Sequence, residues 1–439
     1  MRKKIAIICL FVMLVQTGFS QTLDKVKLDN YFMELEKSNK FMGSVAISQN
    51  GEIIYTKSIG YADVKTKSKA NDNTKYRVGS VSKSFTSVLV MKAVEDSKLT
   101  LETKLKQFFP TIKNADKITV SNLLNHRSGI HNFTSDSTYL TWSMKKKSEM
   151  EMIKVIEAGG SDFEPDTKAV YSNSNYVLLS YILQKIYKKT YAEILTEKII
   201  KPVGLKNTSF GGKINLKNNE CNSYGYVTNW EIEAETDTSI PMGAGAIIST
   251  PSDLTKFAAA LFEGKIISLK SVELMKVLKD NYGFGLIQMP FEDKKGYGHN
   301  GSIDGFRSIY SYFPTEKLAV AITSNANNYK MNKIALVLCG AAFNKPYEIP
   351  NFNGFVLKTE DLDKYLGVYG IKDMPFKITI TKNGKVLVAQ ATGQSSFELE
   401  ATEKDKFQFD RAKLTLEFKP NDKILILNQG GQATTFIRE

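Results

Sequence analysis

The strongest candidate for a functional site in this chain is the stretch Tyr76-Arg-Val-Gly-Ser-Val-Ser-Lys-Ser-Phe-Thr-Ser-Val-Leu-Val90. In it, Ser80 and Lys83 stand where a polar, glycine-containing approach gives way to an apolar helical pattern, and their spacing puts both side chains on one helix face. A serine hydroxyl is a poor nucleophile until a base takes its proton, and a lysine can be that base when burial lowers its pKa. The stretch therefore predicts a helix whose first turn carries Ser80 as nucleophile and Lys83 as its base.

The Ser-x-x-Lys pattern is short, and it occurs a second time at Ser143 and Lys146. There it lies inside the charged run Met144–Lys147, where we expect a solvated surface lysine rather than a base. The pattern by itself therefore does not identify a site, and the remaining motifs must decide whether Ser80 is catalytic.

A second polar motif, Val170-Tyr-Ser-Asn-Ser-Asn-Tyr176, precedes the apolar run from Val177 to Ile186. Its serines and asparagines are typical of a helix N-cap, and the run predicts a buried helix. Tyr171 and Asn173 would lie on the loop before that helix, where side chains can face a cleft while the scaffold holds them still. In the alternative interpretation, Tyr171 fills the core and Asn173 is the cap.

A third motif, Gly298-His-Asn-Gly-Ser-Ile-Asp-Gly-Phe306, leads into two strand-like runs, Phe306–Phe313 and Leu318–Thr323. His299 lies beside a glycine-bounded turn that enters a sheet edge. Such an edge can offer a backbone N–H to a substrate carbonyl, and Ser302 is the natural donor.

The other two histidines have less support as functional groups. His126, in Leu123-Leu-Asn-His-Arg-Ser-Gly-Ile130, could be a general base, but no acid or nucleophile lies at a telling distance in the sequence. We therefore expect His126 to pack and hydrogen-bond where a helix enters a glycine turn. The sequence gives even less support for a functional role of His131.

The N-terminal residues predict an exported protein. Three cations at residues 2–4, an apolar run at residues 5–15 and small residues after it are typical of a signal peptide, which we place at residues 1–20. The run is too short for a membrane span, so we expect no stable span once the peptide is removed and a location in the periplasm or outside the cell.

The rest of the chain divides into two domains. A helix with Leu28 and Leu35 on one face, followed by a hairpin turned at Asn50-Gly51, begins a first domain at residues 21–343, which contains all three motifs. Prolines and weak periodicity predict a linker at residues 344–359. Six short strand-like runs between residues 376 and 427 predict a small all-β barrel or sandwich at residues 360–439, without catalytic features.

Composition excludes several classes of function. The formal net charge is +13, but no dense block of lysine and arginine with interleaved aromatics accompanies it, so nucleic acid is a poor partner. Only three histidines occur, and none has ligand spacing to another histidine or cysteine, so we expect neither a metal nor another cofactor. Cys221 and Cys339 could pair in an exported protein, and the sequence leaves this open.

Taken together and in this order, Ser80-Val-Ser-Lys83, Tyr171-Ser-Asn173 and His299-Asn-Gly301 resemble the motifs of the serine β-lactamase and penicillin-binding-protein superfamily. The resemblance is to the branch of class C β-lactamases, DD-peptidases, D-aminopeptidases and esterases, and it runs from about Phe41 to Phe343. It implies an α/β (α+β) fold of the β-lactamase/transpeptidase type, with an antiparallel sheet flanked by helices, a helical subdomain and the active site between them. The C-terminal module resembles small β-barrel domains appended to some of these enzymes.

The resemblance also implies roles for the motif residues. Ser80 would be acylated with help from Lys83, and Tyr171 would shuttle protons, with a phenolate favoured by the nearby ammonium. Asn173 would bind the substrate amide, and the N–H groups of Ser80 and Ser302 would form the oxyanion hole. The roles implied for the third motif complete the substrate-binding set: His299, Gly301, Ser302.

One departure from the family pattern bears on substrate. His299 stands where most β-lactamases carry the lysine of a Lys-Thr-Gly motif, and a histidine is partly neutral at pH 7. Arg307 could supply the missing cation, although an outward-facing strand residue is the simpler interpretation. We therefore expect an exported serine hydrolase of peptides or amides, similar to a D-alanyl-D-alanine carboxypeptidase or D-aminopeptidase. The alternatives are an esterase, a β-lactamase, and a non-catalytic binding protein; the oligomeric state is open.

Overall fold

The computed structural model describes residues 23–226, 229–352, 357–372, 374–409 and 412–439. The signal peptide predicted at residues 1–20 lies outside this range. Among the described residues, no helix combines the length and the apolar character that a membrane crossing needs.

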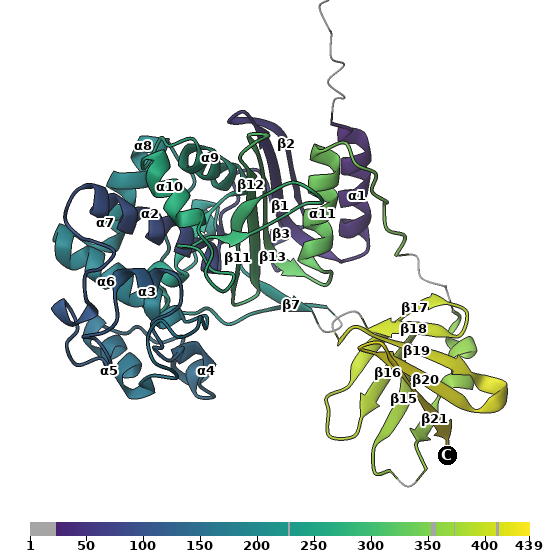
Figure 1. Cartoon of the computed structure of the whole chain (residues 1–439). Coiled ribbons are helices and arrows are strands. Elements are labelled where there is room, and N and C mark those ends of the chain that lie inside the picture. Colours follow the sequence, from purple (N-terminus) through teal and green to yellow (C-terminus); the bar gives the residue numbers. More distant parts are fainter. Residues whose placement is uncertain (1–22, 227–228, 353–356, 373, 410–411) are drawn as a thin grey trace, which may run out of the picture.

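An antiparallel sheet of six strands forms the centre of the catalytic part (Figure 1). Its strand order is β10-β11-β12-β13-β1-β2, so the N-terminal hairpin joins the sheet beside strands from far along the chain. Asn50 and Gly51 both have positive φ, as the predicted tight turn between β1 and β2 requires. The bounds of the sheet strands are β1 (Phe41–Gln49), β2 (Glu52–Ile59), β10 (Ile287–Gln288), β11 (Tyr297–Ile303), β12 (Phe306–Phe313) and β13 (Leu318–Asn327).

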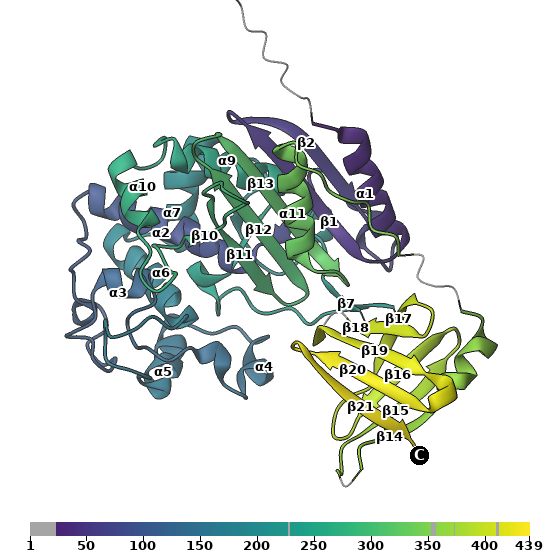
Figure 2. The ribbon, with the colours of Figure 1, turned by 45° about the vertical axis from the view of Figure 1, so that its right-hand side comes forward.

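Helices cover both faces of this sheet, as Figures 1 and 2 show. α1 (Lys25–Lys37) and α11 (Met331–Ala342) pack on one face and share a core with β1, β2 and β13. α9 (Pro251–Phe262) packs on the other face. Thr250 caps its N-terminus, and Pro251 occupies its first position, where proline is favoured. The sheet is therefore buried on both sides, which explains its long apolar strands.

The helical subdomain adjoins the α9 face, and one continuous core joins it to the sheet. Its central helices are α2 (Ser82–Glu95) and α6 (Asn173–Tyr187), which are buried on nearly all sides because other elements surround them. Its remaining helices are α3 (Val120–Leu124), α4 (Tyr139–Trp142), α5 (Glu149–Gly159), α7 (Tyr191–Leu195), α8 (Lys201–Val203) and α10 (Leu269–Lys276).

Short strands connect the sheet to the helical subdomain. They form a three-stranded group, β5-β9-β6, and two pairs, β3-β4 and β7-β8. The β7-β8 pair lies in the polar region from 207 to 235. Their bounds are β3 (Tyr61–Asp63), β4 (Ser68–Lys69), β5 (Tyr76–Arg77), β6 (Ser209–Phe210), β7 (Tyr224–Tyr226), β8 (Trp230–Ile232) and β9 (Ile247–Ser249).

The C-terminal module is a closed eight-stranded barrel with its own core. All six strands predicted there are present, but the sequence analysis missed the first and last, because β14 is half glycine and β21 is mostly exposed polar residues. Lys40 joins the catalytic part to the barrel through an ion pair with Glu400 at 3.1 Å. The strands are β14 (Gly367–Gly370), β15 (Lys377–Asn383), β16 (Val386–Ala391), β17 (Phe397–Glu403), β18 (Lys406–Phe409), β19 (Leu414–Lys419), β20 (Ile424–Gln429) and β21 (Gln432–Arg438).

Two local predictions about helix starts were wrong. Ser80 lies in a 3₁₀ turn, Gly79–Val81, and α2 begins only at Ser82. Asn173 is the first residue of α6 rather than a loop residue, and Ser172 occupies the N-cap position without a capping hydrogen bond from its side chain. The hydroxyl of Ser172 is instead directed to a backbone carbonyl of the preceding loop.

Replacing Phe85 by alanine should lower the free energy of unfolding of the catalytic part by about 3–5 kcal/mol, because a fully buried ring would leave a cavity. Phe85 of α2 stacks on Phe257 of α9 with ring centroids 3.8 Å apart. This contact joins α2 to α9, which packs on the sheet. Denaturant unfolding measures the change. As a control, Val26→Ala on the 72% exposed Val26 should cost less than about 0.5 kcal/mol; similar losses in both variants would contradict this account.

Candidate active site

Two glycines hold the turn that carries Ser80 against β11. Gly79 has φ +49°, and a Cβ there would lie 2.7 Å from the backbone N of Ser302. A Cβ on Gly301 would lie 2.0 Å from the carbonyl oxygen of Val78. Only residues without side chains allow this approach, so the structure places Gly301 as a packing contact beneath the nucleophile turn.

Lys83 lies one helical turn after Ser80, and its side chain is fully buried. Its Nζ is 3.1 Å from Ser80 Oγ, 2.8 Å from Asn173 Oδ1 and 2.8 Å from the carbonyl oxygen of Ala244. Burial lowers the pKa of Lys83 well below its ordinary value of 10.5. The predicted proximity of Ser80 and Lys83 is therefore present in the structure.

The three contacts of Nζ can be satisfied by an ammonium, which donates to all three, or by a neutral amine. An amide oxygen and a backbone carbonyl can only accept hydrogen bonds, so Asn173 and Ala244 take the two hydrogens of a neutral amine. Its lone pair is then left for the hydroxyl hydrogen of Ser80. This arrangement is compatible with the base that the Ser-x-x-Lys pattern predicts, and sequence reasoning missed the contact with the carbonyl of Ala244.

Tyr171 contacts the same serine from another side. Its hydroxyl donates to Ser80 Oγ at 2.7 Å, and its ring lies 4.8 Å from Lys83 Nζ. Burial raises the pKa of Tyr171 above its ordinary value. Burial therefore favours a neutral phenol in the free protein, and the proton shuttle that the resemblance implies for Tyr171 stays a prediction.

His126 holds Tyr171 in place. Its backbone has φ +60°, its side chain is buried, and its ring packs on Tyr171 with centroids 4.5 Å apart. Nδ1 accepts a hydrogen bond from the backbone N–H of Ser172 at 3.1 Å, and burial lowers the pKa of His126 well below 6.5. The structure thus bears out a packing and hydrogen-bonding residue, although the sequence did not show which motif it supports.

Asn173 is oriented by contacts on both sides of its amide. Its Oδ1 accepts from Lys83, and its Nδ2 donates to Thr134 Oγ1 at 3.0 Å and to Asn132 Oδ1 at 3.3 Å. The amide is thereby fixed with its nitrogen turned away from the lysine, where a substrate carbonyl could compete with Thr134 for the same donor.

His299 is buried on β11, and the structure corrects the expectation of a partly charged ring. Burial lowers the pKa of His299 from 6.5 to about 4, so the imidazole is neutral at pH 7. Its Nδ1 lies 2.5 Å from the carbonyl oxygen of Asn300 and therefore carries the ring proton. Arg307 does not replace the missing cation in this position, since it donates to the carbonyls of Asp304 and Phe306 at the β11–β12 turn.

Two further groups lie apart from this cluster. His131 is a surface residue whose ring nitrogens contact Asp162 and Asp136, and these carboxylates raise its pKa. Cys221 and Cys339 are free, buried thiols, so the pairing that the sequence left open is absent from the structure.

A cavity of about 500 Å³ opens beside Ser80. Ser80 and Asn173 line it together with Ser302, whose exposed position on β11 suits the predicted oxyanion donor. Glu233 and Asp304 line its outer wall, and the sequence analysis identified neither. Glu233 follows β8 and Asp304 follows β11, and the position of each relative to Ser80 depends on long-range folding.

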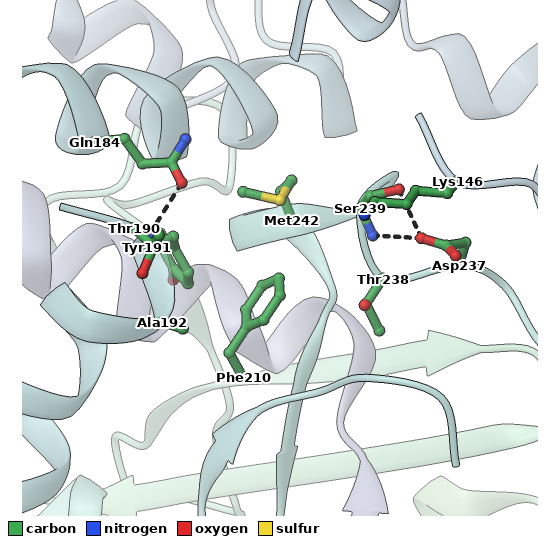
Figure 3. Close-up of a pocket in the computed structure, with 10 residues that line it drawn as sticks. All are labelled: Lys146, Gln184, Thr190, Tyr191, Ala192, Phe210, Asp237, Thr238, Ser239 and Met242. Atoms are coloured by element: carbon green, nitrogen blue, oxygen red, sulfur yellow. Dashed lines mark hydrogen bonds between the residues drawn. The ribbon is translucent and has the colours of Figure 1, made fainter. Parts of the chain in front are cut away.

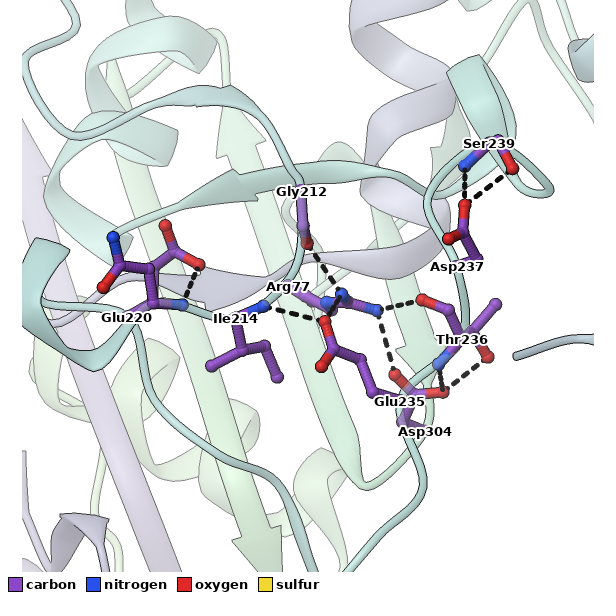
Figure 4. A network of polar contacts seen from close by, with 10 residues as sticks. Arg77, Gly212, Ile214, Glu220, Glu235, Thr236, Asp237, Ser239 and Asp304 are labelled. Carbon is purple, nitrogen blue, oxygen red and sulfur yellow. Dashed lines mark hydrogen bonds and ion pairs between the residues drawn. The ribbon is translucent and has the colours of Figure 1, made fainter. Parts of the chain in front are cut away.

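A buried cation supports that wall from behind (Figure 4). Arg77 Nη1 donates to the carbonyl of Thr236 at 2.6 Å and lies 3.2 Å from Asp304 Oδ2. Its Nη2 donates to Glu235 Oε1 at 2.5 Å and to the carbonyl of Gly212 at 3.0 Å. Arg77 therefore ties three separate segments together beneath the cavity.

A second cavity, of about 400 Å³, lies apart from Ser80 (Figure 3). Lys146, Tyr191, Asp237 and Met242 are among its lining residues. Ser143 of the second Ser-x-x-Lys pattern is buried and lines the first cavity instead. The two members of that pattern thus face different cavities, which agrees with the expectation that it is not a catalytic pair.

A serine hydroxyl in contact with both a buried lysine and a tyrosine is the arrangement of a serine hydrolase. The Beta-lactamase family matches this chain over residues 28–336. The chain belongs to the β-lactamase family, and its sheet, helical subdomain and barrel are the fold expected from the resemblance.

Individual relatives extend this result. Penicillin-binding protein 4* of Bacillus subtilis (strain 168) is 25% identical over 446 positions, covering 94% of this chain and 98% of that protein. A teichoic acid D-alanine hydrolase of Staphylococcus aureus is 26% identical over 306 positions, covering 68% of this chain and 73% of that protein. The crystal structure of D-amino acid amidase from Ochrobactrum anthropi SV3 complexed with L-phenylalanine amide matches with a TM-score of 0.63 at 26% identity, over 73% of this chain and 99% of that chain.

The neutral burial of His299 should make the protein sensitive to acid. The unfolded chain binds a proton at this residue below pH 6.5 while the folded protein does not until about pH 4. The free energy of unfolding should therefore decrease as the pH is lowered from 6.5 to about 4. The loss from this group should be about 3 kcal/mol in total, at about 1.4 kcal/mol per pH unit.

Denaturant unfolding of the wild type and of His299→Gln at pH 7 and pH 4.5 tests this linkage. The variant lacks the titrating ring, so its loss of stability between the two pH values should be smaller by about 2 kcal/mol. Equal losses in both proteins would mean that His299 titrates normally in the folded state.

Proposed function

We propose that this protein is an exported serine hydrolase that acts through an acyl-enzyme on Ser80. Its substrates would be peptides or amides, as for a D-alanyl-D-alanine carboxypeptidase or a D-aminopeptidase. One observation carries the proposal: the hydroxyl of Ser80 is in contact with both Nζ of a buried Lys83 and the hydroxyl of Tyr171. Export is supported by the pattern of residues 1–20 alone.

Acylation uses each of these groups once. Neutral Lys83 takes the proton of Ser80, whose oxygen attacks the substrate carbonyl carbon. The N–H groups of Ser80 and Ser302 stabilise the oxyanion. When the bond to the leaving atom breaks, that atom takes the hydroxyl proton of Tyr171. The resulting phenolate lies beside the Lys83 ammonium, which returns a proton to it.

Deacylation repeats the sequence with water in place of Ser80. The lysine, neutral again, accepts a proton from the water as its oxygen attacks the ester carbon. The ester oxygen of Ser80 leaves with a proton supplied by Tyr171. Amides and esters share this path, so an esterase activity follows from the same groups.

Two observations bear on the choice of substrate. A teichoic acid D-alanine hydrolase and a D-amino acid amidase are among the similar proteins, which supports an acyl group of D configuration. The neutral His299 does not supply a fixed cation for the carboxylate of a penicillin, which weighs against a β-lactamase.

Replacing Lys83 by methionine should lower kcat by about 10²–10⁴-fold, because the base is lost while the apolar stem still fills its site. Hydrolysis of p-nitrophenyl esters, D-alanine amides and D-alanyl-D-alanine peptides gives the rates, and intact-mass spectrometry detects the acyl-enzyme. Lys146→Met is the matched control and should keep wild-type rates, since Lys146 faces the second cavity. A Ser80→Ala variant that still forms the adduct would contradict the proposal.

The pH profile should show an acid limb set by Lys83. Burial lowers its pKa well below 10.5, so the neutral base persists to a lower pH than in an ordinary lysine and is lost as the pH falls through that lowered value. We expect kcat/KM to decrease about tenfold per pH unit on that limb. His299→Gln should leave the acid limb in place. If the limb disappears in that variant, it reports the titration of His299 and not that of Lys83.

A further inference from the structure

The charged side chains that line the Ser80 cavity are both carboxylates. They belong to Glu233 and Asp304, and no lysine, arginine or histidine lines the cavity within the described part of the chain. Lys83 meets the site only through its buried amine, and Lys146 faces the second cavity. A ligand that enters beside Ser80 therefore meets negative charge and no exposed positive charge.

Arg77 does not cancel this charge. Its Nη1 and Nη2 are directed to Asp304, Glu235 and two backbone carbonyls, so the guanidinium is already held by the protein. It lies 3% exposed and cannot reach a ligand without breaking those contacts. One guanidinium stands against three carboxylates when Glu233 is included, which leaves an excess negative charge at the cavity wall.

Glu233 is the carboxylate that remains without a cation. It follows β8, and its backbone N–H donates to the carbonyl of Ser223 at 2.8 Å. Its side chain lies over two glycines: a Cβ on Gly225 would be 2.4 Å from Oε1, and a Cβ on Gly305 would be 3.1 Å from Cγ. Among the described residues its carboxylate forms no ion pair. An exposed carboxylate in a lined cavity can receive a cation from a ligand.

The cavity corresponds to the acyl side of the substrate. The leaving atom must face the hydroxyl of Tyr171 to be protonated, and neither Tyr171 nor His299 lines this cavity. Ser302 lines it, and the wall continues along β11 and its turn to Asp304, away from His299. The group that remains bonded to Ser80 therefore extends toward the two carboxylates.

From this charge distribution we propose that Glu233, the lining carboxylate that Arg77 does not contact, recognises a free ammonium group on the acyl part of the substrate. The substrate class is then an amide or ester of an amino acid with an unblocked amino group. Penicillins and acidic N-acyl peptides would be poor substrates because they bring negative charge to the same wall. This inference rests on the proposed function, since it assigns a specificity to the Ser80 acyl-enzyme.

The test compares two substrates that differ in one group. D-alanine p-nitroanilide carries an ammonium, and D-lactic acid p-nitroanilide carries a hydroxyl in its place. The wild type should prefer the ammonium substrate in kcat/KM, and Glu233→Gln should lower that value by about threefold to tenfold while leaving the lactate substrate nearly unchanged. Glu231→Gln is the matched control, an exposed acid on β8 that does not line the cavity.

A reversal of charge gives a second readout. Glu233→Lys should invert the preference, so that a succinyl p-nitroanilide is hydrolysed faster than the D-alanine compound. Rising salt should narrow the wild-type preference, because the carboxylate is exposed. If the wild type hydrolyses both uncharged and ammonium substrates equally, or if Glu233→Gln slows both to the same extent, the proposed recognition is overturned.

Calorimetry separates this inference from the catalytic proposal. A Ser80→Ala protein cannot turn over, yet it should bind D-alanine p-nitroanilide more tightly than the lactate compound, and Glu233→Gln in the same background should remove the difference. Equal binding of the two compounds overturns the role of Glu233. Hydrolysis that survives Ser80→Ala overturns the proposed function instead, whatever the binding result.

Discussion

The burial of one lysine is the constraint on which the rest of the site depends. A charged ammonium inside the protein costs far more than any single contact returns, so burial lowers the pKa of Lys83 and favours its neutral form. A neutral amine still has two hydrogens, and both need acceptors. α6 supplies the amide oxygen of Asn173, and the turn before β9 supplies the carbonyl of Ala244. Three distant segments must therefore meet around Nζ before Ser80 acquires a base.

The same demand explains the glycines around the site. Gly243 lies where a Cβ would be 2.6 Å from Thr86 Oγ1, so the segment that presents Ala244 can approach α2 only without a side chain there. Gly79 and Gly301 play the equivalent part between the nucleophile turn and β11. The backbone of the run from 242 to 246 therefore lies close against α2.

Local patterns allowed the motifs to be predicted but not their surroundings. The ordered motifs correctly indicated that four side chains lie together: Ser80, Lys83, Tyr171 and Asn173. These residues could be predicted because each belongs to a short motif with a fixed spacing in the sequence. The support of Tyr171 by His126 left no such pattern, since it depends on a positive φ and on a contact across 46 residues. Strands β14 and β21 were missed for a related reason. Their glycine-rich and polar sequences do not predict strands, and they form strands because each finds a partner when the barrel closes.

The electrostatics of the cleft follow from keeping this lysine neutral. Carboxylates close to Lys83 would favour its ammonium form and remove the base. Asp304 stands at the end of the strand that carries Ser302, yet its two oxygens are occupied by Arg77 and Thr236. A buried arginine thus compensates the carboxylate nearest the catalytic strand, while Glu233 stays exposed at the wall, where water screens it. An acidic cleft and a neutral lysine can then exist in one site, because the charge is compensated near the base and left uncompensated only where a ligand enters.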